Sequence, residues 1–166
     1  MPARPILLYP DPLLRQVAAV VDDFGSDLSL LAADLTDTLL AVSAIGLAGP
    51  HIRALQRVVV ARLEPGGEAR TYVNPVVAWA SPELASHEEG SVSMPGTRDT
   101  ITRPERVRIR FQTITGDTQE EPLAGFPAAV LQHEIDQLDG VFWIDRLSRL
   151  KRDRLLKRHS KLRASR

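Results

Sequence analysis

The sequence of 166 residues has no cysteine, few aromatic residues and no long apolar run. Without cysteine, the chain cannot form disulfide bonds or offer a thiolate to a metal. Without about 18 consecutive apolar residues, it is not expected to span a membrane. The first residues, MPARPILLYPDP, are interrupted by prolines and lack the apolar core of a signal peptide. We therefore expect a cytoplasmic protein that makes no membrane contact.

The formal net charge is zero, but the charges are unevenly distributed. Residues 149–166 contain nine lysines and arginines and a single acid, Asp153, so acids predominate in the rest of the chain. A basic C-terminal helix with a narrow apolar seam is predicted over 148–166 from the spacing of Leu147, Leu150, Leu155 and Leu162. Such a helix either lies in solvent, docked by its leucines and with His159 solvated, or binds phosphate backbones.

Hydrophobic residues make up 43% and charged residues 25% of the chain, which suits one compact domain over residues 1–166. Apolar periodicity predicts helices over 26–43 and 126–138, and strands over 57–63, 71–77, 107–111 and 120–123. The small residues of 44–50 are typical of backbone that approaches a ligand closely. Strands and helices do not alternate regularly, so α+β is the expected fold class. Trp143 is expected in the core. His87 is expected in an exposed loop, with a pH-sensitive position at the rim of the pocket as the alternative.

The most informative motif is His133-Glu134-Ile135-Asp136-Gln137. In the pattern His-Glu-x-x-His, two histidines one helical turn apart bind one metal, and the glutamate serves a bound water. Here the first histidine and the glutamate are present, but Gln137 occupies the position of the second histidine. The motif therefore indicates a metal-hydrolase helix that lacks one imidazole ligand.

Two further segments accompany this helix, namely Ile45-Gly46-Leu47-Ala48-Gly49-Pro50-His51 and Glu88-Glu89-Gly90-Ser91-Val92-Ser93-Met94-Pro95-Gly96. In this order, the three segments resemble peptide deformylase, the metalloenzyme that removes the N-formyl group from nascent bacterial proteins. The family's motifs are like Gly-x-Gly-Leu-Ala-Ala-Pro-Gln, Glu-Gly-Cys-Leu-Ser and Gln-His-Glu-x-Asp-His-Leu-Asp-Gly. The likeness extends over residues 5–160 and includes Arg103, an arginine that follows the second motif.

The resemblance implies a peptide deformylase fold. In that fold, small and mainly antiparallel sheets surround the helix of the third motif, with one helix N-terminal and another C-terminal to them. The resemblance also implies that His133 is a retained metal ligand. Ser91 and Gln137 then stand at the positions of the family's other two ligands, a cysteine and a histidine.

The resemblance assigns further roles in the site. Glu134 is implied to be the catalytic carboxylate, and Leu47 is implied to be another of the catalytic residues. His51 stands where the family has a glutamine that donates to the formyl oxygen as it becomes an oxyanion. The substrate pocket is expected to contain Ile45, Gly46, Glu89, Gly90, Val92, Ala129 and Val130.

The replacements at the ligand positions weaken metal binding. A serine hydroxyl supplies no soft anionic ligand at neutral pH, and an amide oxygen suits harder cations than iron or zinc. We therefore expect no cofactor, or a weakly bound divalent metal such as Fe, Zn or Ni. The leading interpretation is a deformylase-like protein with a degenerate metal site and little or no deformylation of N-formyl-methionyl peptides. Its pocket can still bind a peptide N-terminus.

The alternative is an active hydrolase that removes a formyl or acyl group from a peptide or small substrate. His51 and His133 could hold a metal in a rearranged site, or a weakly held ion could leave residual deformylation. Ser91 could instead be a nucleophile, with one of these histidines as its base and Glu134 orienting that base. The resemblance also implies that the basic C-terminal helix can contact the ribosome.

Overall fold

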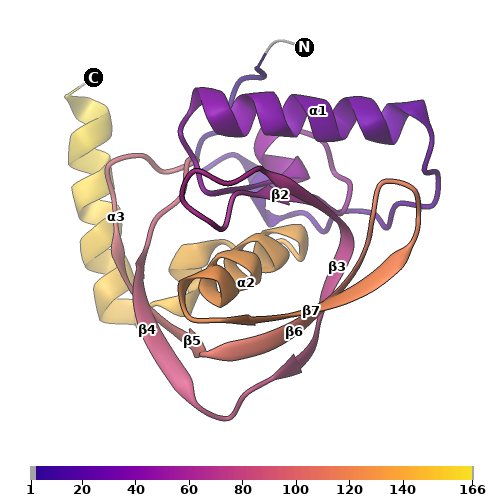
Figure 1. Ribbon diagram of the computed structural model, residues 1–166. Coiled ribbons are helices and arrows are strands. Elements are labelled where there is room, and N and C mark those ends of the chain that lie inside the picture. The colour runs from indigo at the N-terminus through magenta and orange to yellow at the C-terminus, as the bar shows by residue number, and fades with distance from the viewer. Residues whose placement is uncertain (1–2, 166) are drawn as a thin grey trace.

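The computed structural model describes residues 3–165, which form three α-helices and seven strands (Figure 1). The helices are α1 (Ser26–Ala41), α2 (Phe126–Leu138) and α3 (Arg149–Ala164). The larger sheet is antiparallel, and its strands in spatial order are β1 (Gly46–Ala48), β2 (Val58–Ala61), β3 (Arg70–Ala80), β6 (Arg106–Gln112) and β7 (Thr118–Ala124). A separate antiparallel pair contains β4 (Leu84–Glu89) and β5 (Asp99–Pro104).

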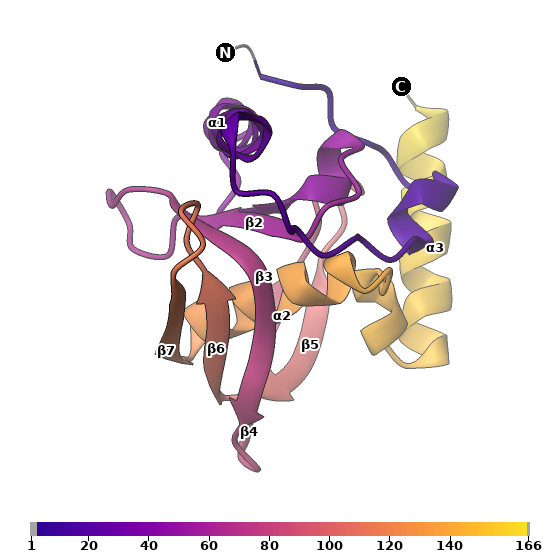
Figure 2. The same cartoon turned by 90° about the vertical axis from the view of Figure 1, so that its right-hand side faces the viewer.

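Strand β2 lies between α1 and α2 in both views of the molecule (Figures 1 and 2). All four of its residues are buried, and successive side chains of a strand point to opposite faces of the sheet. Val58 and Val60 pack with the leucines of α1, whereas Val59 and Ala61 belong to the core that contains α2. A strand covered on both faces needs an apolar residue at every position, which the sequence Val-Val-Val-Ala provides.

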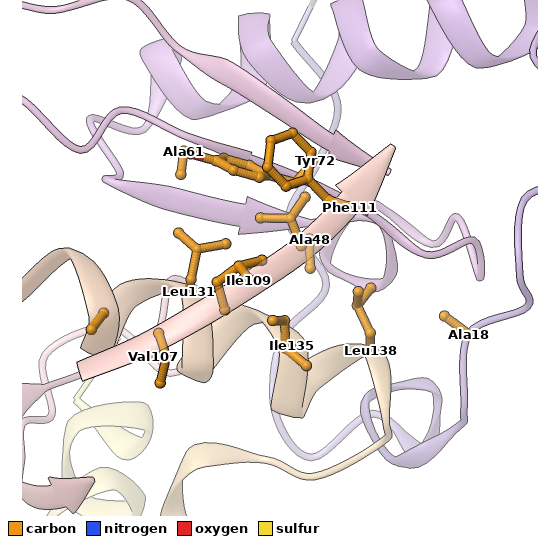
Figure 3. Packing of buried hydrophobic residues seen from close by; sticks show 12 residues of the cluster. Ala18, Ala48, Ala61, Tyr72, Val107, Ile109, Phe111, Leu131, Ile135 and Leu138 are labelled. Carbon is orange, nitrogen blue, oxygen red and sulfur yellow. The ribbon is translucent and has the colours of Figure 1, made fainter. Parts of the chain in front are cut away.

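The core around α2 fixes the orientation of this helix (Figure 3). Leu131, Ile135 and Leu138 lie on one side of α2 and are buried with Ile109 and other inward-facing residues of the large sheet. Each fully buried leucine or isoleucine contributes roughly 1.5–3 kcal/mol. Packing on this side holds the helix firmly, so another side of α2 is free to form a site.

Helix α3 packs at the edge of the molecule through a third apolar cluster. Leu147 and Leu155 are buried there with Trp143, whereas Leu150 is 61% exposed. The apolar seam of the helix is therefore narrower than the leucine spacing predicts. The expectation that His159 is solvated is wrong, since it is 5% exposed and its ring meets the ring of Tyr9 at 5.7 Å. His159 follows Leu155 by four residues and so lies on the same buried face.

Most of the predicted elements are confirmed. The α+β class is correct, α2 has the predicted bounds, and Trp143 is 2% exposed in the core. Helix α1 ends at Ala41, slightly before the predicted end, and the segment 44–50 contains the short strand β1. Strands β4 and β5 were not predicted, because β4 is polar and has a single buried residue. No helix within residues 3–165 is long and apolar enough to cross a membrane.

Candidate functional site

A cavity of about 490 Å³ lies beside α2 and is formed by three segments far apart in the sequence. One wall is the segment 43–46, which leads into β1. The second is the end of β4 with the loop that follows it, and the third is α2. These segments bring together most of the predicted site residues, namely Ile45, Gly46, Glu89, Gly90, Ser91, Val92, Ala129, Val130, His133 and Glu134.

The helical period of α2 explains which of its residues reach the cavity. Phe126, Ala129, Val130, His133 and Glu134 line it, and their spacing of three or four residues places them along one side of a helix. Leu131, Ile135 and Leu138 are not among these cavity residues and lie on the buried apolar side described above. The same helix therefore anchors itself in the core and presents a titratable pair to the cavity.

His133 is held by a chain of hydrogen-bonded charged groups that runs from the cavity toward the surface. Its Nδ1 lies 2.9 Å from Glu89 Oε1. Arg103 donates to both oxygens of Glu89 and to Asp136, which also accepts from the guanidinium of Arg146. An imidazole whose Nδ1 is bonded to a carboxylate has Nε2 left for the cavity, the usual arrangement of a metal-binding histidine and its supporting group.

These contacts set the protonation of both partners. Burial opposes the ionised form of Glu89, but hydrogen bonds from His133 and Arg103 outweigh it and lower the pKa of Glu89 to about 2. Burial likewise opposes protonation of His133, yet its hydrogen bond to Glu89 raises the pKa of the imidazole above the ordinary value. Glu89 is therefore ionised at neutral pH, and its oxygens are already hydrogen-bonded to Arg103 and His133.

Glu134 is a buried carboxylate whose hydrogen bonding is incomplete. It is 5% exposed, and its Oε1 has no hydrogen-bond partner among the described residues. A Cβ on Gly46 would lie 2.9 Å from Glu134 Oε2, so the glycine leaves the room that the carboxylate occupies. Burial raises the pKa of Glu134 to about 6. A carboxyl group with such a pKa in a cavity is suited to exchanging a proton or to pairing with a cationic ligand.

His51 lies next to Glu134 and is 1% exposed. Its Nδ1 accepts the backbone N–H of Ala48 at 3.0 Å, which places the ring proton on Nε2. Burial and the nearby charge of His133 lower the pKa of His51 to about 3, so the ring is neutral. Nδ1 is 3.8 Å from Glu134 Oε1, too far for a hydrogen bond, and Nε2 has no partner in the described part of the chain. His51 does not line the cavity.

Ser91 and Gln137 both use their side chains to bind backbone. The Oγ of Ser91 accepts the N–H of Ser93 at 3.1 Å, and within residues 3–165 it has no hydrogen bond to an imidazole. Gln137 is 2% exposed, and its Nε2 donates to the carbonyl oxygen of Leu14 at 2.7 Å. This bond ties the end of α2 to the 3₁₀ helix Pro12–Arg15. Ser91 lines the cavity, whereas Gln137 does not.

Comparison with known proteins identifies the family. Residues 3–153 match the family model described as polypeptide deformylase. A peptide deformylase-like protein of Rhizobium meliloti (strain 1021) is 50% identical, over 97% of this chain and 94% of that protein. The chain belongs to the peptide deformylase family. The peptide deformylase of Phenylobacterium zucineum (strain HLK1) is 41% identical, and the alignment covers 97% of each chain.

Solved structures of peptide deformylases have the same fold. The enzyme of Legionella pneumophila superposes with a TM-score of 0.88 at 35% identity, over 99% of each chain. That of Ehrlichia chaffeensis gives a TM-score of 0.92 at 26% identity, over 98% of each chain. The fold predicted from the three motifs is thereby confirmed. Peptide deformylases are metal-dependent, but within residues 3–165 no three His, Cys, Asp or Glu side chains are grouped to hold a metal ion.

The cavity is also lined by residues that lie outside the predicted set of site residues. Phe126 and Arg98 line it, and so does His87, which lies half-buried in β4 and meets the ring of Phe126 at 6.2 Å. The expectation of an exposed loop at His87 is therefore wrong, because the segment pairs with β5, whereas the alternative position at the pocket agrees with the cavity lining. The position of Phe126 could have been predicted, because its helical spacing from His133 places both residues on the same side of α2. By contrast, Leu47 is fully buried near α1 and does not line the cavity.

Proposed function

We propose that this peptide deformylase family member has a degenerate metal site and performs little or no deformylation of N-formyl-methionyl peptides. The proposal rests on the hydrogen bonds that the side chains at the family's three ligand positions make. His133 keeps the supporting hydrogen bond of a metal ligand, whereas Ser91 and Gln137 are bonded to backbone groups. A catalytic Fe²⁺ or Zn²⁺ site needs about three protein ligands, commonly imidazole, thiolate or carboxylate. The residues at these positions do not fit such an ion.

The remaining groups do not replace what the metal supplies to the family's reaction. A bound metal lowers the pKa of its water and polarises the carbonyl that is attacked. Glu134 can accept a proton, but its neighbour His51 is neutral, buried and outside the cavity lining. Neither group lowers the pKa of a water molecule to near neutrality.

The cavity itself is well suited to a peptide N-terminus or a small formylated or acylated ligand. Its wall includes the apolar side chains of Ile45, Val92, Phe126 and Val130, which can receive the first side chain of a peptide. The charged groups lie at its inner end and its rim. The protein thus retains the recognition part of a deformylase site, and the name of the Rhizobium relative, peptide deformylase-like, agrees with this proposal.

An active hydrolase is the second candidate, because two buried polar atoms lack partners in the part of the chain that the structure describes. These atoms are His51 Nε2 and Glu134 Oε1. A rearranged metal site would have to recruit His51 together with His133. A Ser91 nucleophile would require its Oγ to leave Ser93 and bond to an imidazole.

The deciding experiment combines elemental analysis of anaerobically purified protein with an assay of formyl-Met-Ala-Ser turnover. We expect substoichiometric metal and no turnover above that of a blank. Stoichiometric iron, zinc or nickel together with turnover would refute the proposal and favour the hydrolase. Turnover by metal-free protein would instead favour Ser91, and it should then disappear in Ser91→Ala.

We also propose that α3 contacts the ribosome. Its exposed basic residues include Lys151, Arg154, Lys157 and Arg158, and the helix is attached to the body mainly through Leu155 and His159. A row of exposed cations on a well-docked helix is suited to RNA phosphates. Such a contact would place the protein in the cytoplasm, near emerging peptide N-termini.

A further inference from the structure

Helices cover the two faces of the large sheet unequally. Helix α2 packs on one face, and α1 packs on the opposite face over β1 and β2. In Figure 2, the strands β6, β7 and the end of β3 lie in front of α2, and no helix of the described chain lies in front of them. Within residues 3–165, the outer face of these three strands, which points away from α2, therefore has no covering layer.

The outer face exposes apolar side chains at the end of β3. Trp79 is 45% exposed and Val76 is 44% exposed. Their partners on β6 are Arg108 and Arg110, and residues paired across a sheet point to the same face. Since Ile109, between these arginines, is buried in the core beside α2, both pairs lie on the outer face. Tryptophan is enriched at the centres of protein interfaces, which makes Trp79 suited to a contact with a partner.

A groove of about 490 Å³ lies beside Trp79. It is lined by Trp79, by residues 106–108 of β6 and by residues 122–124 of β7. Pro122 and Ala124 are exposed and have short side chains, so the face is low over β7 and high at the indole of Trp79. The outer face thus presents a protruding aromatic ring and a hollow next to each other.

The two arginines that line the groove are both paired with acids. Arg106 donates to Glu83 at 2.6 Å, and its guanidinium carbon lies 6.0 Å from the centre of the Trp79 ring. Arg108 donates to Glu120 at 2.7 Å. A face whose cations are paired in this way has little attraction for a polyanion such as nucleic acid. Opposite charges side by side are instead complementary to the same arrangement turned through half a revolution.

We propose that the outer face, centred on Trp79, binds the same face of a second copy of this chain. A twofold axis beside Trp79 places the indole of each copy in the groove of the other, so both contacts form at once and the assembly closes as a dimer. Around the two rings, arginines of one copy approach acids of the other. The groove and the cavity beside α2 share no lining residue, so the inference goes beyond the proposed function and does not depend on it.

The test is sedimentation velocity and tryptophan fluorescence of the wild-type chain between about 1 and 500 μM. With one aromatic anchor on each copy, the interface belongs to the weak class, and we expect half-dimerisation at about 10–100 μM. Over the same range, the emission should shift to shorter wavelength as the indole of Trp79 leaves water. The other tryptophan, Trp143, is only 2% exposed, so the shift reports on Trp79.

Two variants change the two halves of the contact separately. Trp79→Glu removes the ring, whereas Ala124→Arg fills the groove and keeps the ring. Each should weaken dimerisation by about 30-fold or more, which is the effect of losing an interface anchor. The matched control Leu150→Glu introduces an acid at a 61% exposed leucine of α3, and it should change the dimerisation constant by less than about threefold.

A wild-type chain that stays monomeric over the whole concentration range would overturn the inference. A dimer that persists in Ala124→Arg and forms without a fluorescence shift would show that the contact lies elsewhere. Assemblies larger than a dimer would contradict the closed twofold contact. If Trp79→Glu does not fold, Ala124→Arg and the wild-type fluorescence still decide the question. None of these outcomes changes the expected metal content or turnover, so the proposed function is tested separately.

Discussion

The double substitution Ser91→Cys with Gln137→His should restore metal binding, because the support for two of the three ligands is still in place. Glu89 already holds the Nδ1 of His133 at 2.9 Å. At position 137 the carbonyl oxygen of Leu14 accepts an N–H at 2.7 Å from the present amide. A histidine there could donate one ring N–H to this oxygen and present the other nitrogen to a metal.

The size of the effect follows from the completed ligand set. Cysteine at 91 with histidines at 133 and 137 gives the thiolate and two imidazoles of a three-ligand catalytic site. Metal at about 100 times its dissociation constant stabilises the folded state by about 2.7 kcal/mol. For a chain of 166 residues, that corresponds to a rise in Tm of about 5–10 °C. Adding Glu89→Gln to the double variant should weaken metal binding by about 10–100-fold, since the support of His133 is then changed.

The measurements are metal content, cobalt(II) absorption and Tm with and without zinc. The matched control Ser29→Cys with Gln119→His places the same residue types at exposed positions outside the cavity, one in α1 and one in β7, and it should show none of these changes. We expect partial recovery of formyl-Met-Ala-Ser turnover, and further recovery if His51→Gln is added. A folded double variant that binds no metal would refute the claim that the supporting groups are intact. Bound metal without any turnover would refute the expected rescue of activity.

Four other predictions test separate features. The pKa of His51 is lowered from 6.5 to about 3. The stability that depends on its neutral ring is therefore complete above pH 6.5 and is lost as the pH falls toward 3. Between pH 7 and 4, the free energy of urea unfolding should fall by about 3 kcal/mol less in His51→Gln than in wild type. Because the pKa of Glu134 is raised from 4.5 to about 6, Glu134→Gln should stabilise the protein by about 2 kcal/mol at pH 7, and the gain should vanish as the pH falls through 6 toward 4.5. Arg103→Met leaves the buried Glu89 without its guanidinium partner and should cost about 3–5 kcal/mol in denaturant unfolding. Neutralising Arg152, Arg154, Lys157 and Arg158 should weaken ribosome cosedimentation and flatten its salt dependence, and unchanged binding would contradict the proposed contact.

The parts of the site that sequence reasoning found are those encoded by local spacing. The period of α2 separates Leu131 and Ile135, which pack in the core, from His133 and Glu134, which line the cavity. Both sets can be recognised in a short stretch of sequence, because helical geometry alone decides which residues share a side. The bounds of this helix were predictable for the same reason.

The partners of the replaced residues could not be found in this way. Gln137 bonds to the carbonyl oxygen of Leu14, far away in the sequence, and that pairing exists only after the N-terminal segment has docked on α2. The polar strand β4 was missed because its pairing with β5, and not apolar alternation, makes it a strand. His159 was misplaced because a histidine on a basic helix can be covered by an element elsewhere in the chain, here by Tyr9.

Ser91, Gln137 and Glu134 differ in how far the fold satisfies their polar groups. The side chains of Ser91 and Gln137 form hydrogen bonds with backbone groups, so both positions contribute to the fold. Within residues 3–165, Oε1 of Glu134 has no such bond, and burial raises the pKa of Glu134, so its ionised form is disfavoured in the folded protein. A glutamine would fill the same space without a buried charge. If Glu134→Gln stabilises the protein at neutral pH and this gain disappears as the pH falls through 6, the carboxylate is explained by a role in the cavity and not by the stability of the fold.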